Sequence, residues 1–288
     1  MARVVSIINL KGGVGKTTLT VALSEFIAIK YPKKRILVID LDPQSNSSVA
    51  LIGEDNWDKH VKKGWTLFTL FKDQLDDTSN FDLNASVVKK SSNLNGGLTN
   101  LHVLPSSLEF INIQDRLVNI SQTALIRPID VLNTALEGLL KQYELVLIDC
   151  PPSLGLVTRN GLVLSNYFLI PVIPDRLSTW GIPEILSEMN KFKQKTGAAL
   201  KPLGIVVSLY RSGVRRHEAT IRELQTNHRV KSWPKVFSSK IPLAAKIADS
   251  TDWEALGVNT LKQKYGWAGT NSFECISNIV EEFIADVF

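Results

Sequence analysis

Leu10-Lys11-Gly12-Gly13-Val14-Gly15-Lys16-Thr17-Thr18 is the stretch that decides the fold of this 288-residue chain. The apolar run at 3–9 before it predicts a short buried strand, and the apolar spacing over 16–30 after it predicts a helix. Glycines let the backbone turn with positive φ and approach an anion closely. Consecutive amides then point into one concavity at a helix N-terminus, which carries partial positive charge. The stretch therefore predicts a phosphate-binding loop.

Each position of this loop has a predicted task. Lys16 is expected to reach the β- and γ-phosphates of ATP, and the Thr17 hydroxyl to ligate Mg²⁺. The standard pattern has Gly five residues before Gly15, where this chain has Leu10, and it has the additional Lys11 instead. This is the deviant Walker A form, K-G-G-x-G-K-[ST]. The residues expected to cradle the nucleotide are Gly12, Gly13, Val14, Gly15, Lys16, Thr17 and Thr18.

Apolar runs without alternation recur along the chain and indicate parallel strands covered on both faces. With helical patterns between them, they predict the α/β class: a doubly wound, mostly parallel sheet with helices on both faces.

One domain over residues 1–288 is expected. No separate N-terminal DNA-binding domain is expected, because only Met1 and Ala2 precede the first strand. Residues 76–97 are expected to be a polar surface excursion. Further strands are predicted at 35–39, 101–104, 145–148, 167–172 and 203–209, and helices at 114–140 (with a possible interruption at Pro128), 183–196, 216–227 and 272–287.

Acidic residues end two of the predicted strands. Asp40 and Asp42 follow one strand, and Asp149 follows another. Ligands of parallel sheets bind at the carboxyl ends of the strands, so these acids should lie near the phosphates. There a carboxylate orients an attacking water or holds a metal-bound water, and Asp149 has the Walker B arrangement for Mg²⁺. Cys150 is expected to be a small buried side chain rather than a nucleophile.

Charge is unevenly distributed. Residues 191–246 contain 13 Lys and Arg against two acids, so this block carries +11 and the remainder −6 of the total of +5. Such a block indicates either a polyanion partner or a solvated basic surface.

No apolar run approaches the roughly 20 residues that span a bilayer, and no signal peptide is evident. Two cysteines provide neither a disulfide framework nor a four-ligand metal site, so a cytoplasmic location is expected.

The chain is similar to the ParA family of deviant Walker ATPases, which position plasmids, chromosomes and other cargo. The resemblance covers most of the chain. It rests on KGGVGKTT at 11–18, VIDLDPQSN at 38–46, LPSSLE at 104–109 and ELVLIDCPPSLG at 144–155, with weaker support from PVIPD at 171–175 and SSKIPLAAKIADS at 238–250.

The resemblance implies a catalytic site shared between two copies. Members dimerise around two ATP molecules, with the lysine that matches Lys11 reaching the partner's phosphates. The residue matching Asp42 positions the hydrolytic water, and Asp40 supports the metal shell. Gly12 and Gly13 would lie at the dimer seam, where a side chain would block close approach. The catalytic residues implied are thus Lys11, Lys16 and Asp42, and the metal-site residues are Thr17, Asp40 and Asp149.

The resemblance also implies partners. The ATP-bound dimer is expected to bind nonspecific double-stranded DNA, with a nucleoid-associated location, and a ParB-like adaptor is expected to stimulate slow hydrolysis. The cargo could be a plasmid, a chromosome or a protein organelle such as the carboxysome. Many relatives have Asn where this chain has Ser208, which leaves the adenine contacts open. The residues expected to contact DNA are Arg211, Arg215, Arg216, Lys240 and Lys246.

Alternatives on the same scaffold are open to different degrees. A membrane-positioning MinD-like ATPase needs a basic amphipathic tail, whereas the predicted helix at 272–287 has acidic polar positions and no Lys or Arg follows Lys264. No direct membrane binding is therefore expected. Iron–sulfur relatives need cysteine ligands that two distant cysteines do not supply. A metabolic ATP-dependent ligase or synthetase stays open, because it needs the phosphate loop but not the basic block. The four histidines share no metal-ligand spacing and are expected at the surface or in loops.

Overall fold

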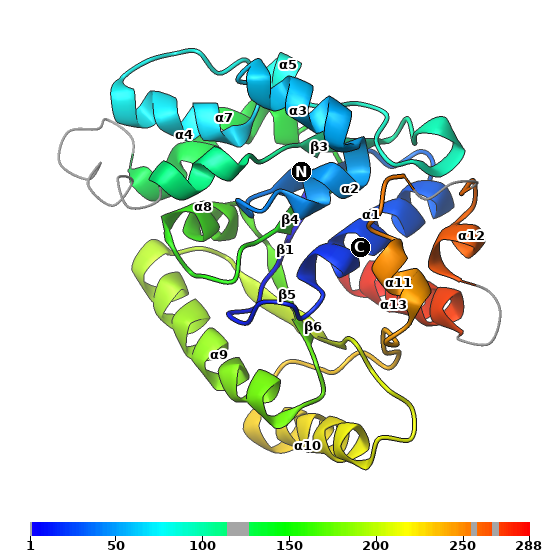
Figure 1. Cartoon of the computed structure of the whole chain (residues 1–288). Coiled ribbons are helices and arrows are strands. Elements are labelled where there is room, and N and C mark those ends of the chain that lie inside the picture. Colours follow the sequence, from blue (N-terminus) through cyan, green and yellow to red (C-terminus); the bar gives the residue numbers. More distant parts are fainter. Residues whose placement is uncertain (1, 114–126, 255–257, 267–270) are drawn as a thin grey trace.

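A computed structural model describes residues 2–113, 127–254, 258–266 and 271–288. Its centre is a six-stranded sheet in the order β3-β2-β4-β1-β5-β6, and every pair of neighbouring strands is parallel (Figure 1). The doubly wound α/β prediction is confirmed, and among the described residues this sheet has no antiparallel strand. The strands are β1 (Arg3–Ile7), β2 (Ile36–Asp40), β3 (Leu101–Leu104), β4 (Leu145–Asp149), β5 (Tyr167–Val172) and β6 (Lys201–Val207).

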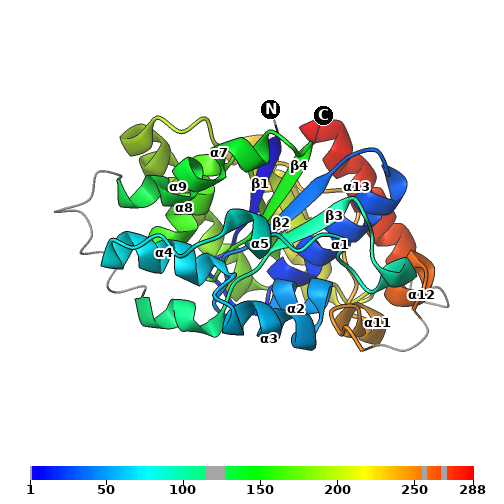
Figure 2. The same ribbon diagram turned by 90° about the horizontal axis from the view of Figure 1, so that it is seen from above.

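Helices cover both faces of the sheet. In Figure 1, α1, α11, α12 and α13 lie on one side of the strands and α8 and α9 on the other, and the view from above in Figure 2 shows the same division. No described helix is long and apolar enough to cross a membrane. The α-helices are α1 (Lys16–Lys30), α2 (Asn46–Ile52), α3 (Glu54–Lys62), α4 (Leu67–Asp76), α5 (Leu83–Ser86), α7 (Val131–Leu140), α8 (Leu156–Leu164), α9 (Arg176–Thr196), α10 (Arg215–Lys231), α11 (Ala245–Asp249), α12 (Leu261–Tyr265) and α13 (Ser272–Val287), and the 3₁₀ turns are η1 (Leu94–Gly96), η2 (Leu108–Ile113) and η4 (Pro128–Asp130).

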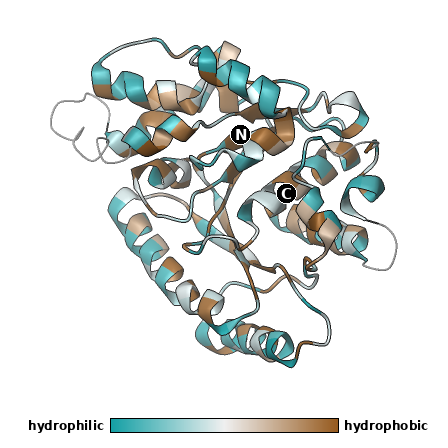
Figure 3. Ribbon diagram, viewed as in Figure 1, coloured by the Kyte–Doolittle hydropathy of each residue, from teal (hydrophilic) through white to brown (hydrophobic). Residues whose placement is uncertain are grey.

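Two apolar cores follow from the alternation of side chains along each strand. Val4 belongs to the core that contains residues of α7, α8 and α9, whereas its neighbour Val5 belongs to the core that contains residues of α1 and α13. Leu37 and Val38 of β2 are divided between the two cores in the same way. Because both faces are covered, the strands are apolar almost throughout, and they are brown in Figure 3, while the outer faces of α9 and α10 are largely teal.

Several predicted boundaries were wrong. Helix α9 begins at Arg176, seven residues before the predicted start, because the Asp175 side chain accepts a hydrogen bond from the Ser178 amide and caps it. The exposed Pro183 is accommodated inside this helix. Strand β6 covers 201–207 rather than 203–209. Helices α2, α3, α4 and α8 were not predicted, since short amphipathic segments give weak periodicity.

Two other expectations need correction. Residues 76–97 are only partly a surface excursion, because Leu94 and Ser92 are buried and Val88 forms a bridge with Val103 of β3. His102 is buried and hydrogen-bonded to the Tyr143 hydroxyl rather than lying on the surface. Of the helix predicted at 114–140, residues 114–126 lie outside the described residues, and the rest forms η4 and α7.

Candidate functional site

The glycine-rich stretch forms a loop between β1 and α1. Gly13 and Gly15 have φ of 69° and 82°, in the left-handed region that favours glycine. The Ser208 hydroxyl, just beyond β6, donates a hydrogen bond to the Val14 carbonyl (2.7 Å) and supports the loop from beneath. The Lys16 amine is buried and donates to the Lys11 carbonyl (3.2 Å). Burial lowers the pKa of Lys16, while the charges of Asp149 and Asp42 oppose that shift.

Sheet register brings the predicted acids to this loop. Asp149 lies directly between Ile7 of β1 and Asp40 of β2 at the carboxyl edge of the sheet. The Thr17 hydroxyl donates to Asp149 Oδ2 (2.8 Å), which joins two of the three predicted metal-site residues. Asp149 Oδ1 is buried and has no hydrogen-bond partner among the described residues. A hydroxyl and a carboxylate with a free oxygen are the donors that Mg²⁺ prefers, so the residues present fit this ion.

The two buried carboxylates at this edge are costly to ionise. Burial, with the nearby charge of Asp40, raises the pKa of Asp149 to about 8. Burial also raises the pKa of Asp40 to about 6, although hydrogen bonds from Ser48 lower it in part. The Asp40 and Asp149 carboxylates are both desolvated and repel each other when ionised. Such an arrangement is typical of a site that a bound cation completes.

Asp149→Asn is expected to stabilise the nucleotide-free, metal-free protein. Between about pH 4 and pH 8 the unfolded Asp149 is ionised while the folded one keeps its proton, so native stability falls as pH rises. Asn does not titrate, and melting temperatures should show the gain of the variant growing from about pH 5 to pH 8. The control is Asp55→Asn, at an exposed position, which should show no such trend. A variant less stable than the native chain throughout this range contradicts the prediction.

Asp40 and Asp42 have different surroundings. Asp40 is fully buried, and its two carboxylate oxygens accept hydrogen bonds from Asp42 in the following loop and from Ser48 in the first turn of α2. Asp42 lies closer to solvent, and its Oδ1 accepts a hydrogen bond from the Gln44 amide (3.0 Å). Asp42 Oδ2 accepts no hydrogen bond from the described residues and is available to orient a water molecule.

The additional lysine of the loop is held by the first turn of α9. Lys11 Nζ donates to the Ser178 hydroxyl (2.8 Å) and lies 3.7 Å from Asp175 Oδ2. Burial tends to raise the pKa of Asp175, but hydrogen bonds from Ser178 and the charge of Lys11 hold it below its ordinary value. The Lys11 side chain remains 41% exposed despite these contacts.

The predicted DNA contacts come from four segments, with Lys240 in the loop between α10 and α11. Arg211, Arg215, Arg216 and Lys246 are exposed, on the loop after β6, on α10 and on α11. Arg211 and Lys240 line one cavity of about 560 Å³ beside Tyr210. The basic block is less positive than the sequence count suggests, because Lys235 pairs with Glu282 (2.9 Å) and Asp286 of α13. Two further exposed cations on α10, Arg222 and Lys231, were not singled out from the sequence.

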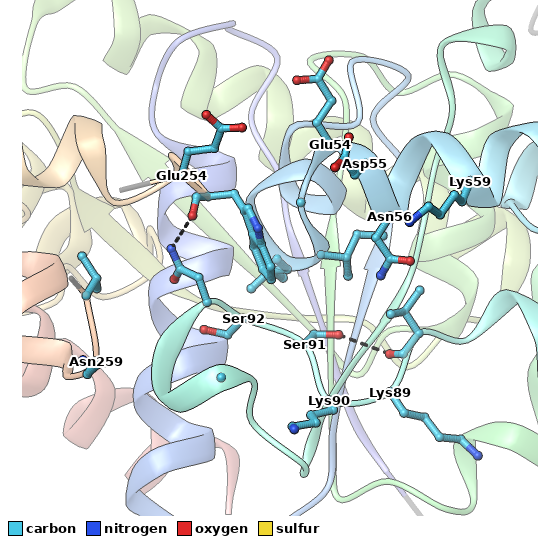
Figure 4. Close-up of a pocket in the computed structure, with 18 residues that line it drawn as sticks. Glu54, Asp55, Asn56, Lys59, Lys89, Lys90, Ser91, Ser92, Glu254 and Asn259 are labelled. Atoms are coloured by element: carbon cyan, nitrogen blue, oxygen red, sulfur yellow. Dashed lines mark hydrogen bonds between the residues drawn. The ribbon is translucent and has the colours of Figure 1, made fainter. Parts of the chain in front are cut away.

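A separate cavity of about 990 Å³ lies away from the phosphate loop, between α3, residues 88–96 and Trp253. Figure 4 shows Glu54, Asp55 and Glu254 on one side of this cavity and Lys89 and Lys90 on the other. The Asn93 side chain donates to the Trp253 carbonyl across it (3.0 Å). Its charges are mixed, and no residue of the phosphate loop lines it. The described residues contain no cluster of three or more His, Cys, Asp or Glu that could hold a metal.

Comparisons with known proteins agree with this geometry. Residues 2–202 match the family model described as AAA domain. The chain is 28% identical over 251 residues to the sporulation initiation inhibitor protein Soj of Bacillus subtilis, covering 87% of this chain and 88% of Soj. Two solved structures have a similar fold. Cobyrinic acid a,c-diamide synthase of Mycobacterium smegmatis with bound ATP analog and magnesium has a TM-score of 0.71 and 22% identity, covering 98% of this chain and 93% of that chain. Apo McdA of Cyanothece has a TM-score of 0.72 and 18% identity, covering 99% of this chain and 100% of that chain.

Proposed function

The chain belongs to the AAA domain family, as a deviant Walker ATPase of the ParA and Soj type, and on this premise we propose that it is an ATP-dependent positioning ATPase. In the proposed cycle, ATP drives formation of a homodimer that binds nonspecific DNA. Slow hydrolysis of ATP then releases the protein from the DNA. One observation carries the proposal: Thr17 and Asp149 are paired beside Lys16, with Asp149 Oδ1 buried and unpartnered.

The roles of the site residues follow from their positions. The loop amides from Gly12 to Thr18 and the Lys16 amine would hold the phosphates of ATP, and Thr17 and Asp149 would hold Mg²⁺. The metal, when bound, neutralises charge on the phosphates. Asp42, with one carboxylate oxygen available, would orient the attacking water. Asp40 supports this arrangement from the interior.

Self-association is supported by the surroundings of Lys11. Leu177 and Trp180, on the first turns of α9 beside the Lys11 contacts, are 72% and 66% exposed. Large apolar side chains this exposed favour a protein partner. The proposed partner is a second copy, in which Lys11 would leave Ser178 and Asp175 for the other copy's phosphates. A cation supplied from outside stabilises developing phosphate charge only when the dimer is assembled.

Lys11→Ala should retain ATP binding but lose ATP-dependent dimerisation and lower kcat by about 10²-fold or more. ATP affinity can be measured with a fluorescent analogue, dimerisation by light scattering, and kcat by phosphate release. Lys16→Ala is the comparison, because it should lose ATP binding as well. Normal dimerisation and hydrolysis by Lys11→Ala would refute the role across the dimer.

Retention on DNA tests the function as a whole. The native chain should be retained on duplex DNA with ATP, but not with ADP or without nucleotide, and retention should fall steeply between two salt concentrations. Reversing two charges, Arg215→Glu with Arg216→Glu, should weaken retention at least about tenfold. Reversal of the exposed Lys89, beside the separate cavity, is the matched control and should change little. If the protein stays monomeric and its retention on DNA is the same with ATP, with ADP and without nucleotide, a metabolic ligase or synthetase is favoured instead.

The remaining parts of the proposal concern cellular context. A ParB-like adaptor would stimulate hydrolysis and link the protein to its cargo, which could be a plasmid, a chromosome or a protein organelle. The location would be the cytoplasm, associated with the nucleoid, without direct membrane binding. The composition of α13 supports the last point, because this helix has acidic residues and no Lys or Arg, and an anionic surface would repel it. Residues 1–288 are proposed to act as a single domain.

A further inference from the structure

Both oxygens of the Asp40 carboxylate accept hydrogen bonds from the segment that follows β2. Its Oδ1 accepts a hydrogen bond from the Asp42 backbone amide (3.0 Å). Its Oδ2 accepts from both the Ser48 amide (2.9 Å) and the Ser48 hydroxyl (2.6 Å). Asp149 differs, because its Oδ1 is buried and accepts no hydrogen bond from the part of the chain that the structure describes. The two acids therefore differ in free acceptor capacity: Asp149 has an oxygen left for a metal-bound water, while both oxygens of Asp40 already bind protein donors.

The loop between β2 and α2 depends on these bonds. Ser45, at the start of α2, has φ of 54°, a conformation unfavourable for a residue with a side chain, and it makes no side-chain cap bond to the helix. Asp40 takes over part of the capping task by accepting from the Ser48 amide in the first turn. Because the same carboxylate holds the Asp42 amide, the position of Asp42 and the start of α2 are fixed together.

Ser48 extends this arrangement into the core. Its hydroxyl donates to Asp40 and accepts from the Ser106 amide (3.1 Å) in the loop after β3. The Ser106 carbonyl in turn accepts from Trp57 Nε1 of α3 (2.9 Å). Ser48 and Ser106 are completely buried, so no water replaces these bonds without a change of packing. A continuous hydrogen-bonded chain thus joins the Asp42 loop to β3 and α3.

From this chain of contacts we propose that Ser48 is a positioning residue for hydrolysis, which acts through Asp40 to hold the Asp42 carboxylate in place. The inference rests on the proposed ATPase function. Removal of the Ser48 hydroxyl deprives Asp40 of one donor and leaves the buried Ser106 amide without its acceptor. The Asp42 loop then samples other positions, which slows the chemical step more than it weakens ATP binding, because the phosphate loop is a separate segment.

The test compares Ser48→Ala, Ser48→Thr and Ser107→Ala in the full chain. Ser107 is the matched control, because its hydroxyl is buried in the neighbouring loop without a partner. For Ser48→Ala we expect kcat for ATP hydrolysis to fall at least about tenfold with KM within about twofold of native. Ser48→Thr retains a hydroxyl and should restore kcat to within about threefold, and Ser107→Ala should match the native chain.

Hydrogen exchange of the nucleotide-free, metal-free chain provides a readout that does not depend on catalysis. Peptides covering residues 40–48 should exchange faster in Ser48→Ala but not in Ser107→Ala or Ser48→Thr. A kcat of Ser48→Ala within twofold of native, an equal loss in Ser107→Ala, or unchanged exchange at 40–48 overturns the inference. If the native chain hydrolyses no ATP, the proposed function fails, and exchange at 40–48 alone then decides whether Ser48 holds this loop.

Discussion

Asp42→Ala should reduce ATP hydrolysis by about 10²- to 10³-fold while the ATP-bound dimer remains assembled on DNA. The reason lies in the geometry at the end of β2. The Asp42 backbone is fixed by Asp40, its Oδ1 is engaged by the Gln44 amide, and its other oxygen is available to orient water. The substitution leaves the phosphate loop and the Thr17–Asp149 pair unchanged, so ATP should bind and stay bound.

Single-turnover phosphate release, combined with DNA retention in ATP, separates these two effects. Retention of Asp42→Ala should persist for many native turnover times, because release follows hydrolysis in the proposed cycle. Asp55→Ala, at an exposed acid on α3, is the control and should hydrolyse ATP at the native rate. Hydrolysis by Asp42→Ala within about fivefold of native would remove Asp42 from the catalytic site.

Glu25→Ala should destabilise the fold by about 3–5 kcal/mol, because it leaves the buried charge of Lys264 without its counterion. Glu25 of α1 is fully buried, and Lys264 Nζ of α12 lies 2.7 Å from its Oε1 with the lysine side chain 2% exposed. The same carboxylate accepts from the Ser92 hydroxyl (2.5 Å) and the Tyr265 hydroxyl (2.6 Å). One substitution therefore breaks the connection of α1 with two other segments.

Urea unfolding of the single and double variants measures this effect. Glu25→Leu combined with Lys264→Met removes both charges and should be less destabilised than Glu25→Ala, since no uncompensated ion remains. Lys141→Ala, which removes an exposed pair with Glu137, is the comparison and should cost less than about 1 kcal/mol. A double variant less stable than the single one would mean that the ion pair itself, rather than the isolated charge, accounts for the loss.

Much of the fold was predictable because its signals are local. The strand at 101–104, the helix at 16–30 and the helix at 272–287 have the predicted bounds. The start of α9 was not predictable from periodicity, because the Asp175 cap lies before a proline that ordinarily indicates a helix start. The buried His102 was missed for a related reason: its partner, Tyr143, is 41 residues away.

In the candidate site, too, the residues with local sequence patterns were predicted and those that depend on tertiary contacts were not. Sequence spacing identified Lys16, Thr17 and Asp149 without the structure, since phosphate loops and acidic strand ends have recognisable local patterns. Their assigned roles are still predictions. The hydrogen bonds of Ser48 to Asp40 and of Ser106 to Ser48 have no such pattern, because each needs a turn and a neighbouring strand in place.

By itself, then, the sequence determined a parallel α/β scaffold with an anion-binding loop after its first strand. The reason is that backbone conformation and the burial of both sheet faces depend on short-range patterns of residues. The tertiary structure alone decided which side chains meet at that loop. The strand order β3-β2-β4-β1-β5-β6 does not follow the chain, so Asp149 comes to lie between Ile7 and Asp40, and Lys11 meets α9, through contacts between residues more than 100 positions apart.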